Sequence, residues 1–143
     1  MEKGTDFRWM YCGCTKLTSL EPLRGWNVEK GENFYCMFEY CSKLTSLEPL
    51  RTWDVRNGKD FSCTFNGCSS LADISPLSSW NTSNGQYFEW MFYSTSIKDG
   101  RALSKWNVGK GQSFKAMFGK NGMNKDMLPK NLKDKNEILS DEL

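Results

Sequence analysis

Six cysteines are the residues of this sequence with the widest chemistry, because thiolates bind metals, form disulfides and act as nucleophiles. Most of them recur at an interval of 27 residues and one stands alone: Cys14, Cys41 and Cys68; Cys36 and Cys63; and the single Cys12. A tetrahedral zinc site usually draws on two close cysteine pairs, whereas this sequence has only Cys12-x-Cys14. A repeat explains the spacing without any ligand. We therefore expect buried or half-buried free thiols, with a disulfide between neighbouring repeats as the alternative, and we predict no metal site.

Acid–base and nucleophilic catalysis have few candidate residues here. The sequence contains no histidine, which removes Ser-His-Asp and Cys-His arrangements and the commonest general base. Glu21 and Glu48 occupy equivalent repeat positions and should have nearly the same surroundings, whereas a catalytic carboxylate pair needs two different ones. The glycines follow the repeat and form no phosphate-binding loop. We expect no enzyme activity, no catalytic residue and no cofactor.

An internal repeat of about 27 residues organises the chain. Segments 17–26 and 44–53 read LTSLEPLRGW and LTSLEPLRTW and differ at one residue. The predicted units are 1–27, 28–54, 55–81, 82–107 and 108–128, which together form one repeat domain over 1–128. Residues 129–143 are polar and are predicted to be a C-terminal cap or tail.

Each unit shows two different patterns. In the second unit Phe34, Met37, Phe38 and Cys41 follow the i, i+3, i+4, i+7 spacing of one helix face, and Asn33 before them is a good N-cap. The leucines of the other half are three residues apart and lead to a proline, which predicts a short strand at 17–20 and its equivalents, followed by a turn. Each repeat is thus predicted to contain one short strand and one short helix.

Stacking of the units would bury their large apolar residues, since one unit cannot bury them alone. The predicted fold class is an α/β repeat, a leucine-rich-repeat-like solenoid of about five coils, with an all-β solenoid as the alternative. The predicted structural core consists of eight repeated aromatic residues: Trp26, Trp53, Trp80, Trp106, Phe34, Phe61, Phe88 and Phe114.

An apolar stripe is predicted on the outer face of the helices. The residue two positions after each repeated phenylalanine would point outward, and in no unit is it charged. Trp and Tyr are the favoured anchors of binding hot spots, so this stripe is a candidate partner-binding surface; the alternative is that its residues pack between neighbouring helices. The candidate residues are Trp9, Tyr35, Tyr40, Trp90 and Tyr93.

Several repeat motifs in a fixed order resemble those of BspA-like leucine-rich-repeat bacterial surface proteins. These motifs are Trp80-Asn81, Met91-Phe92 and the run Gly67-Cys68-Ser69-Ser70-Leu71, and the similarity covers about residues 1–128. The resemblance implies a solenoid that binds other proteins, often in adhesion at the bacterial surface, and it implies no catalytic residue.

Charge and hydropathy limit the classes of partner that this chain can bind. The net charge is +2, with 19 basic and 17 acidic residues spread along the chain, so no basic stripe for nucleic acid is present. No apolar run approaches the roughly 18 residues of a membrane span. We expect a protein partner, and by resemblance a cell-surface or secreted location. The alternative is a cytoplasmic, stand-alone binder that inhibits or regulates another protein, because no signal peptide precedes the first repeat and thiols suit a reducing compartment.

Overall fold

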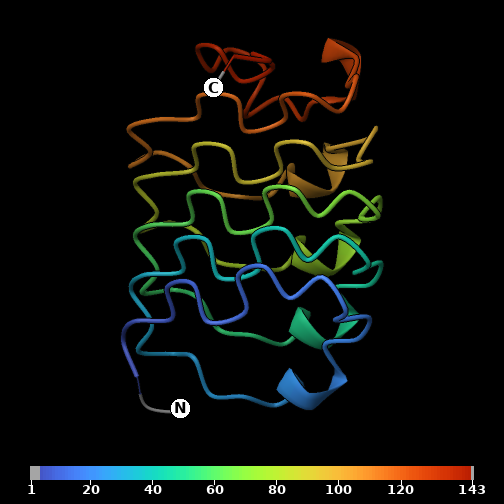
Figure 1. The fold of residues 1–143 in the computed structure, drawn as a ribbon. Helices are drawn as coiled ribbons and strands as arrows, with labels where there is room; N and C mark the ends of the chain where they lie inside the picture. The colour runs from blue at the N-terminus through green and yellow to red at the C-terminus, as the bar shows by residue number, and fades with distance from the viewer. Residues whose placement is uncertain (1–3, 143) are drawn as a thin grey trace.

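Successive repeats of the chain lie one above another as coils. A computed structural model describes residues 4–142, and Figure 1 shows the chain winding from the N-terminal coil to the C-terminal segment at the opposite end of the stack. Four isolated parallel bridges join equivalent residues of neighbouring coils, and they are Asp6–Asn33, Asn33–Asp60, Asp60–Tyr87 and Tyr87–Ser113. The unit predicted at 1–27 includes residues 1–3, which lie outside the described residues.

One side of every coil is a run of consecutive tight turns, which we call the turn ribbon (residues 7–14, 34–41, 61–68, 88–95 and 114–121). Within a coil, N–H groups bond back across single turns, as Met10 N does to Phe7 O and Cys12 N to Trp9 O. The alternate N–H groups bond to the next coil, as Phe7 N does to Asn33 O at 2.9 Å. Peptide groups therefore find partners alternately within one coil and between coils, which satisfies the buried backbone without a regular helix or sheet.

Left-handed residues shape each turn ribbon. The third residue of every turn ribbon has a φ of +54° to +60°, and these residues are Trp9, Cys36, Cys63, Trp90 and Ala116. The seventh also has a positive φ, and its occupants are Gly13, Tyr40, Gly67, Ser94 and Lys120. Non-glycine residues pay roughly 1–2 kcal/mol each for this conformation. They are held there because each N–H is hydrogen-bonded to the next coil or, for Ala116 and Lys120, to the C-terminal segment.

The prediction of an α/β solenoid is wrong. Among residues 4–142 there is no α-helix and no named strand. The apolar spacing i, i+3, i+4, i+7 arises because the turn ribbon returns to the same orientation every four residues, so that Phe34 and Phe38 both point inward. The predicted N-cap Asn33 does accept a hydrogen bond from Tyr35 N, but this closes an Asx turn that opens the turn ribbon.

The all-β alternative is also wrong, since the described contacts between coils are single bridges and not a sheet. The predicted strands at 17–20 and its equivalents are irregular. The regular elements of the described residues are five 3-10 helices of three residues: η1 (Glu21–Leu23), η2 (Glu48–Leu50), η3 (Ser75–Leu77), η4 (Arg101–Leu103) and η5 (Lys125–Met127). Proline occupies the first turn of η1, η2 and η3, where its missing N–H costs nothing.

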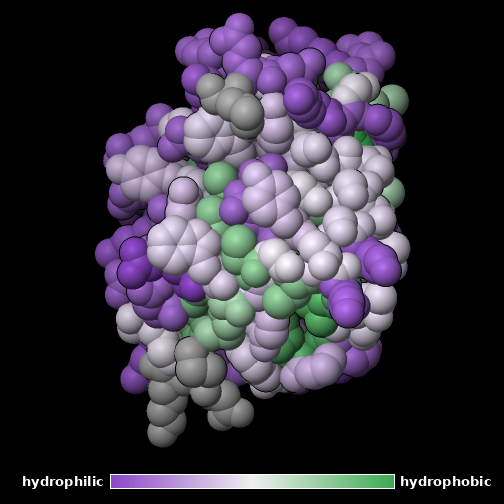
Figure 2. Space-filling model, viewed as in Figure 1, coloured by the Kyte–Doolittle hydropathy of each residue, from purple (hydrophilic) through white to green (hydrophobic). Residues whose placement is uncertain are grey.

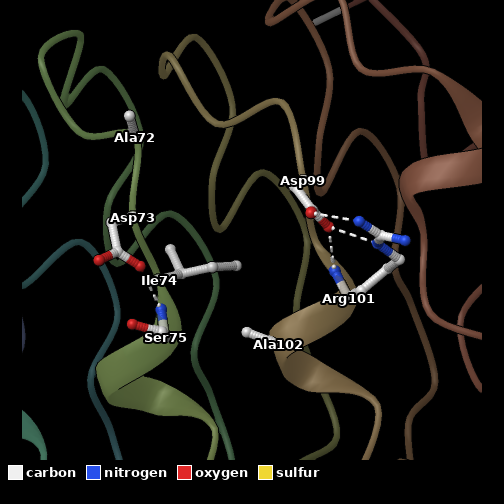
Figure 3. Close-up of a pocket in the computed structure, with 7 residues that line it drawn as sticks. All are labelled: Ala72, Asp73, Ile74, Ser75, Asp99, Arg101 and Ala102. Carbon is white, nitrogen blue, oxygen red and sulfur yellow. Dashed lines mark hydrogen bonds and ion pairs between the residues drawn. The ribbon is translucent and has the colours of Figure 1, made fainter.

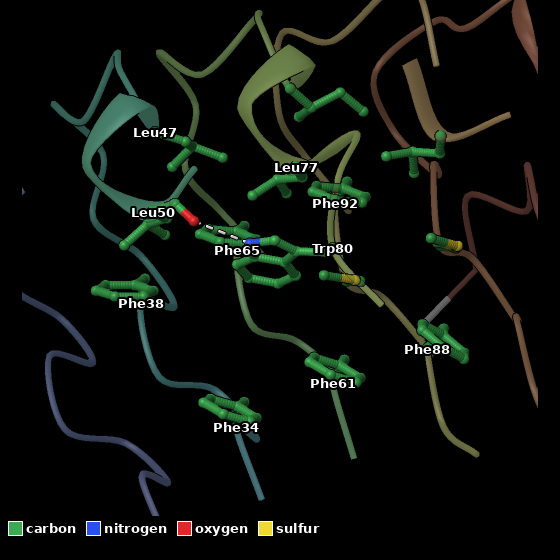
Figure 4. Close-up of a cluster of buried hydrophobic side chains, with 14 of the residues drawn as sticks. Phe34, Phe38, Leu47, Leu50, Phe61, Phe65, Leu77, Trp80, Phe88 and Phe92 are labelled. Atoms are coloured by element: carbon green, nitrogen blue, oxygen red, sulfur yellow. Dashed lines mark hydrogen bonds between the residues drawn. The ribbon is translucent and has the colours of Figure 1, made fainter. Parts of the chain in front are cut away.

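Stacked aromatic rings fill the space between the turn ribbons and the 3-10 helices (Figure 4). One ladder runs Phe7–Phe34–Phe61–Phe88–Phe114, with ring centroids 5.2–5.6 Å apart. A second runs Tyr11–Phe38–Phe65–Phe92–Phe118 at 5.2–5.8 Å. Trp53, Trp80 and Trp106 are buried, whereas Trp26 in the first coil is half-buried. The indole N–H of each of these three buried tryptophans donates to a carbonyl of the preceding coil, as Trp80 does to Leu50 O at 2.9 Å.

The repeated glycines leave room for the first aromatic ladder. A Cβ added at Gly31 would lie 2.6 Å from Phe34 Cζ. At Gly58, Gly85 and Gly111 an added Cβ would likewise overlap the phenylalanine that follows three residues later in each coil. Their φ angles are ordinary. Glycine is therefore needed here for space beside the ring and not for backbone freedom.

The C-terminal segment 129–142 packs on the last coil. Ala116 N and Phe118 N donate to Glu137 O and Ile138 O, which continues the bonding between coils by one more step. Asn131 Nδ2 donates to Leu103 O at 3.2 Å, the role that a tryptophan indole has in the earlier coils. Leu132 and Ile138 are buried against the stack.

Candidate binding surface

Two of the five predicted partner-binding residues are the most exposed large apolar side chains of the described chain. Trp9 is 54% exposed and Tyr40 is 53% exposed. Tyr35 and Trp90 are half-buried. Tyr93 is only 4% exposed and its hydroxyl donates to Asp141 O at 2.8 Å, so the C-terminal segment covers it and it is not available to a partner.

Trp9 is held from two sides. Its ring meets the ring of Tyr35 on the next coil edge-on, with centroids 5.6 Å apart. The guanidinium of Arg8 lies 5.6 Å from the indole centroid, and Asp6 fixes that guanidinium through hydrogen bonds of 3.0 Å. These contacts lower the pKa of Asp6, chiefly through its hydrogen bonds with the Arg8 backbone and side chain. An exposed tryptophan is thus kept in one orientation.

Tyr40 extends over the neighbouring coil. Its ring lies so close to Gly67 that an added Cβ there would overlap it. Gly67 occupies the same repeat position as Tyr40, so glycine in one coil makes room for tyrosine from the coil before. We call Trp9, Tyr35 and Tyr40 the aromatic patch. Figure 2 shows aromatic rings standing on the molecular surface with apolar side chains between them.

One exposed aromatic residue was missed by the sequence analysis. Tyr87 is 37% exposed, and its hydroxyl donates to Gln112 Oε1 at 3.4 Å. It occupies the position before the phenylalanine, where the other coils carry Asp6, Asn33, Asp60 and Ser113. A large apolar residue at an otherwise polar repeat position was the available signal.

Beside the aromatic patch lies a cluster of three thiols and one carboxylate, which we call the thiol cluster (Cys12, Cys36, Cys63 and Glu39). Cys36, Cys63 and Glu39 place their ligand atoms within 4.8 Å of one another, so they are the residues that could hold a metal. Cys12 donates to Glu39 Oε1 at 3.7 Å. All six cysteines are free thiols in this structure.

The aromatic patch and the thiol cluster influence each other electrostatically. The Coulombic interaction with Cys36 is the largest cause raising the pKa of Tyr35 to about 12, and burial adds to it. The charge of Glu39 is the largest cause raising the pKa of Tyr40. Both phenols therefore stay neutral at ordinary pH and offer a hydrogen-bond donor beside an apolar ring.

A shallow hollow between the third and fourth coils is a second candidate site (Figure 3). Its carboxylates are already engaged. Asp99 accepts from Arg101 Nη2 at 2.8 Å, and these bonds lower the pKa of Asp99 to about 2. Asp73 Oδ1 accepts from Ser75 N at 2.9 Å, which also lowers the pKa of Asp73. Both acids are ionised and internally paired, so neither suits a proton donor at neutral pH.

Comparison with known families identifies the chain at the level of its family. Residues 5–131 match the family model described as "Mycoplasma protein of unknown function, DUF285". The chain belongs to this family. The match includes all five turn ribbons and both the aromatic patch and the thiol cluster. This match names the DUF285 family and does not name BspA-like proteins, so it supports the resemblance only at the level of that family.

Other comparisons add little. A search of curated proteins found no match. Among solved structures, an internalin from Listeria monocytogenes is similar over 65% of this chain at 18% identity, with a TM-score of 0.31. The matched region spans 29% of the internalin chain. Within residues 4–142, no helix has the length and apolar character needed to cross a membrane.

Proposed function

We propose that this DUF285 chain is a non-catalytic protein-binding module that contacts its partner through the aromatic patch. The observation that carries the proposal is the exposure of Trp9 and Tyr40, which are 54% and 53% exposed on neighbouring coils. The exposed Trp9 ring contacts the Tyr35 ring of the next coil, and contiguous exposed apolar patches mark interaction sites. Tryptophan and tyrosine also contribute more binding energy per residue than most other side chains.

Rigidity makes these rings suitable anchors. Trp9 N and Tyr40 N donate to Tyr35 O and Asn66 O of the next coils, at 3.0 and 2.7 Å. Their left-handed backbone is thereby fixed before any partner arrives. Little conformational entropy is then lost on binding, which favours affinity.

The acidic residues around the stack support a binding role and not a catalytic one. Glu21 and Glu48 pair with Arg24 and Arg51 at 2.7 and 2.8 Å, and these hydrogen bonds lower the pKa of both glutamates. The two carboxyls have matching surroundings and the same direction of shift. A glycosidase-type pair needs one acid raised and one left ionised.

A location at the bacterial surface or outside the cell is part of the proposal, and the resemblance to BspA-like surface proteins supports it. The second candidate is an intracellular regulator, which the six free thiols favour because thiols persist in reducing compartments. Protease treatment of intact cells separates the two. Loss of the chain from intact cells supports the surface role, and full protection supports the intracellular one.

The binding proposal is tested with Trp9→Gly/Tyr40→Gly. Glycine occupies left-handed positions freely, and Gly13 and Gly67 already fill the Tyr40 position in other coils, so the fold is preserved. The partner is captured on the immobilised wild-type chain, and its affinity for each variant is measured by surface plasmon resonance. We expect a loss of at least ~10-fold, the scale of one hot-spot residue.

The matched control is Tyr87→Ala, which removes an exposed ring two coils away from Tyr40. We expect it to bind like the wild type. Unchanged affinity in the Trp9/Tyr40 variant, or an equal loss in the control, would remove the aromatic patch as the binding surface.

A further inference from the structure

The third and sixth positions of the turn ribbon carry cysteine or glutamate only in the first three coils. Residues at the sixth position of the turn ribbons contact one another from coil to coil, as Cys12 and Asn66 both contact Glu39. The third-position residues Cys36 and Cys63 lie beside Glu39. The third residues are Trp9, Cys36, Cys63, Trp90 and Ala116, and the sixth are Cys12, Glu39, Asn66, Tyr93 and Gly119. Thiols and a carboxylate thus gather only where the first three coils meet. Cys12 has no cysteine equivalent in any other coil, so repetition does not explain it.

The thiol cluster has the dimensions of a metal site. Cys36 Sγ, Cys63 Sγ and a Glu39 carboxylate oxygen lie within 4.8 Å of one another, and Cys12 Sγ is 3.7 Å from Glu39 Oε1. In a tetrahedral zinc site the Zn–S distance of about 2.3 Å puts two sulfur ligands roughly 3.8 Å apart. The 4.8 Å within which the Cys36, Cys63 and Glu39 ligand atoms lie is about 1 Å above that separation.

A supporting residue orients the carboxylate. Asn66 Nδ2 donates to Glu39 Oε2 at 2.8 Å, and Oε1 accepts from the Cys12 thiol. Asn66 is buried, and it occupies the sixth position of the third coil, directly after Glu39 in that ladder. Metal ligands in proteins are commonly held by such a neighbouring hydrogen bond.

The ligand atoms of the thiol cluster are two sulfurs and a carboxylate oxygen, with a third thiol hydrogen-bonded to that carboxylate. This donor set suits a divalent cation, which favours the deprotonated thiols that bind it.

We propose that Cys36, Cys63 and Glu39, joined by Cys12, bind one thiophilic divalent metal ion of the zinc class. Each thiol gives up its proton when its sulfur binds the metal, so three protons leave per ion bound. The ligands come from three consecutive coils, and the ion would fasten those coils beneath Tyr35 and Tyr40. This departs from the sequence-based expectation of no metal, which rested on the single close pair Cys12-x-Cys14 and on the repeat spacing of the cysteines. Folding instead places Cys12 opposite Glu39. The proposal stands independently of the protein-binding function.

The test is a titration of the whole reduced chain, freed of metal by a chelator, with Cd²⁺ as the probe. Binding produces the near-ultraviolet charge-transfer absorption of cadmium thiolates. We expect saturation at one ion per chain, displacement by Zn²⁺, and a rise in the thermal unfolding midpoint with Zn²⁺ concentration. Cys36→Ser/Cys63→Ser should abolish the absorption. Glu39→Gln keeps the shape and the Asn66 contact, and should weaken binding by about 10-fold or more.

The matched control is Cys14→Ser/Cys41→Ser, which removes two thiols of neighbouring coils from the other cysteine ladder and should leave Cd²⁺ binding unchanged. Circular dichroism of each metal-free variant establishes that it folds. The proposal is overturned if the reduced wild type shows no saturable absorption, or if the absorption survives in the Cys36/Cys63 variant. It is equally overturned if the control loses the absorption, or if Glu39→Gln binds like the wild type.

Discussion

Single residues in left-handed conformations decide both the shape and the surface of each turn ribbon. Gly67 and Gly13 share one repeat position and nearly the same φ, +77° and +75°. They differ in their surroundings, because the Tyr40 ring covers Gly67 whereas no atom lies within 4 Å of an added Cβ at Gly13. This pair separates the cost of the backbone conformation from the cost of displacing the ring.

We predict that Gly13→Ala lowers the free energy of unfolding by about 1 kcal/mol, the left-handed cost alone. Gly67→Ala should cost at least ~1 kcal/mol more, because the new methyl group pushes the Tyr40 ring aside. Urea unfolding measures both. In the background Tyr40→Gly the two alanine substitutions should cost the same. If Gly13→Ala and Gly67→Ala lower the free energy of unfolding equally in the wild-type background, the position of the Tyr40 ring does not require glycine at residue 67.

Buried thiols make the fold sensitive to alkali. Burial raises the pKa of Cys68, and burial also raises the pKa of Cys41 to about 11. Each thiol donates to a carbonyl of the preceding coil, Cys68 to Phe38 O at 3.1 Å. In the unfolded chain the pKa of a thiol is nearer its ordinary value of 9.0. The unfolded state therefore releases protons first as the pH rises.

We predict that the free energy of unfolding is highest below pH 9 and declines as the pH rises towards 11 and beyond. The native chain still keeps thiol protons in this range that the unfolded chain has lost. Urea midpoints at pH 8 and pH 10.5 measure the decline. Cys68→Thr should reduce it, since threonine already fills this repeat position at Thr95 and does not titrate. A decline of the same size in Cys68→Thr would assign the effect to other groups.

At the scale of elements, the two aromatic ladders replace the helix and strand layers of more regular repeats. Phe65 stacks on Phe38 at 5.5 Å and on Phe92 at 5.7 Å, and it is completely buried. Tyr11 is the first ring of the same ladder, half-buried and stacked on Phe38 alone within that ladder. The contribution of a ring should therefore depend on its place in the ladder.

We predict that Phe65→Ala costs about 3–5 kcal/mol of unfolding free energy, the usual price of a large cavity in a core. Tyr11→Ala should cost less than half as much, because its ring loses one stacked neighbour and less burial. Denaturant unfolding measures both losses, and the midpoints of the two variants can be compared when their m-values are equal. Equal costs would mean that the ladder does not carry the stability of the stack.

The sequence predicts the aromatic ladders better than the backbone that carries them. A 27-residue interval places Phe34, Phe61 and Phe88 at one repeat position, and the structure stacks them. The turn ribbon could not be foreseen, because apolar residues four apart also fit a helix and Asn33 fits both an N-cap and an Asx turn. No propensity rule places Cys36 or Trp9 at a positive φ, since hydrogen bonds to the next coil impose that conformation.

The candidate site was predictable only in part for a similar reason. Aromatic type and repeat position single out Trp9 and Tyr40, which are exposed. Tyr93 has the same chemistry, but the C-terminal segment 129–142 covers it, and no local pattern predicts such a long-range contact. The meeting of Cys12 with Glu39 likewise depends on the offset between two coils.

For the whole molecule, the stack presents one continuous face of turn ribbons, and the aromatic patch lies on its first two coils. Salt bridges such as Glu21–Arg24 and Glu48–Arg51 line the 3-10 helices instead, with side chains that are largely exposed. Exposed pairs of this kind contribute little to affinity. The partner should therefore meet the turn ribbons and not the 3-10 helices.

Photo-crosslinking tests this claim most directly. A photoreactive phenylalanine analogue is placed at the position of Tyr40 on the turn ribbon in one protein, and at the position of Arg24 beside η1 in another. Each is irradiated with the captured partner. The account predicts a crosslinked adduct with the partner from the Tyr40 position and none from the Arg24 position. An adduct formed only from Arg24, with the partner still bound, would contradict it.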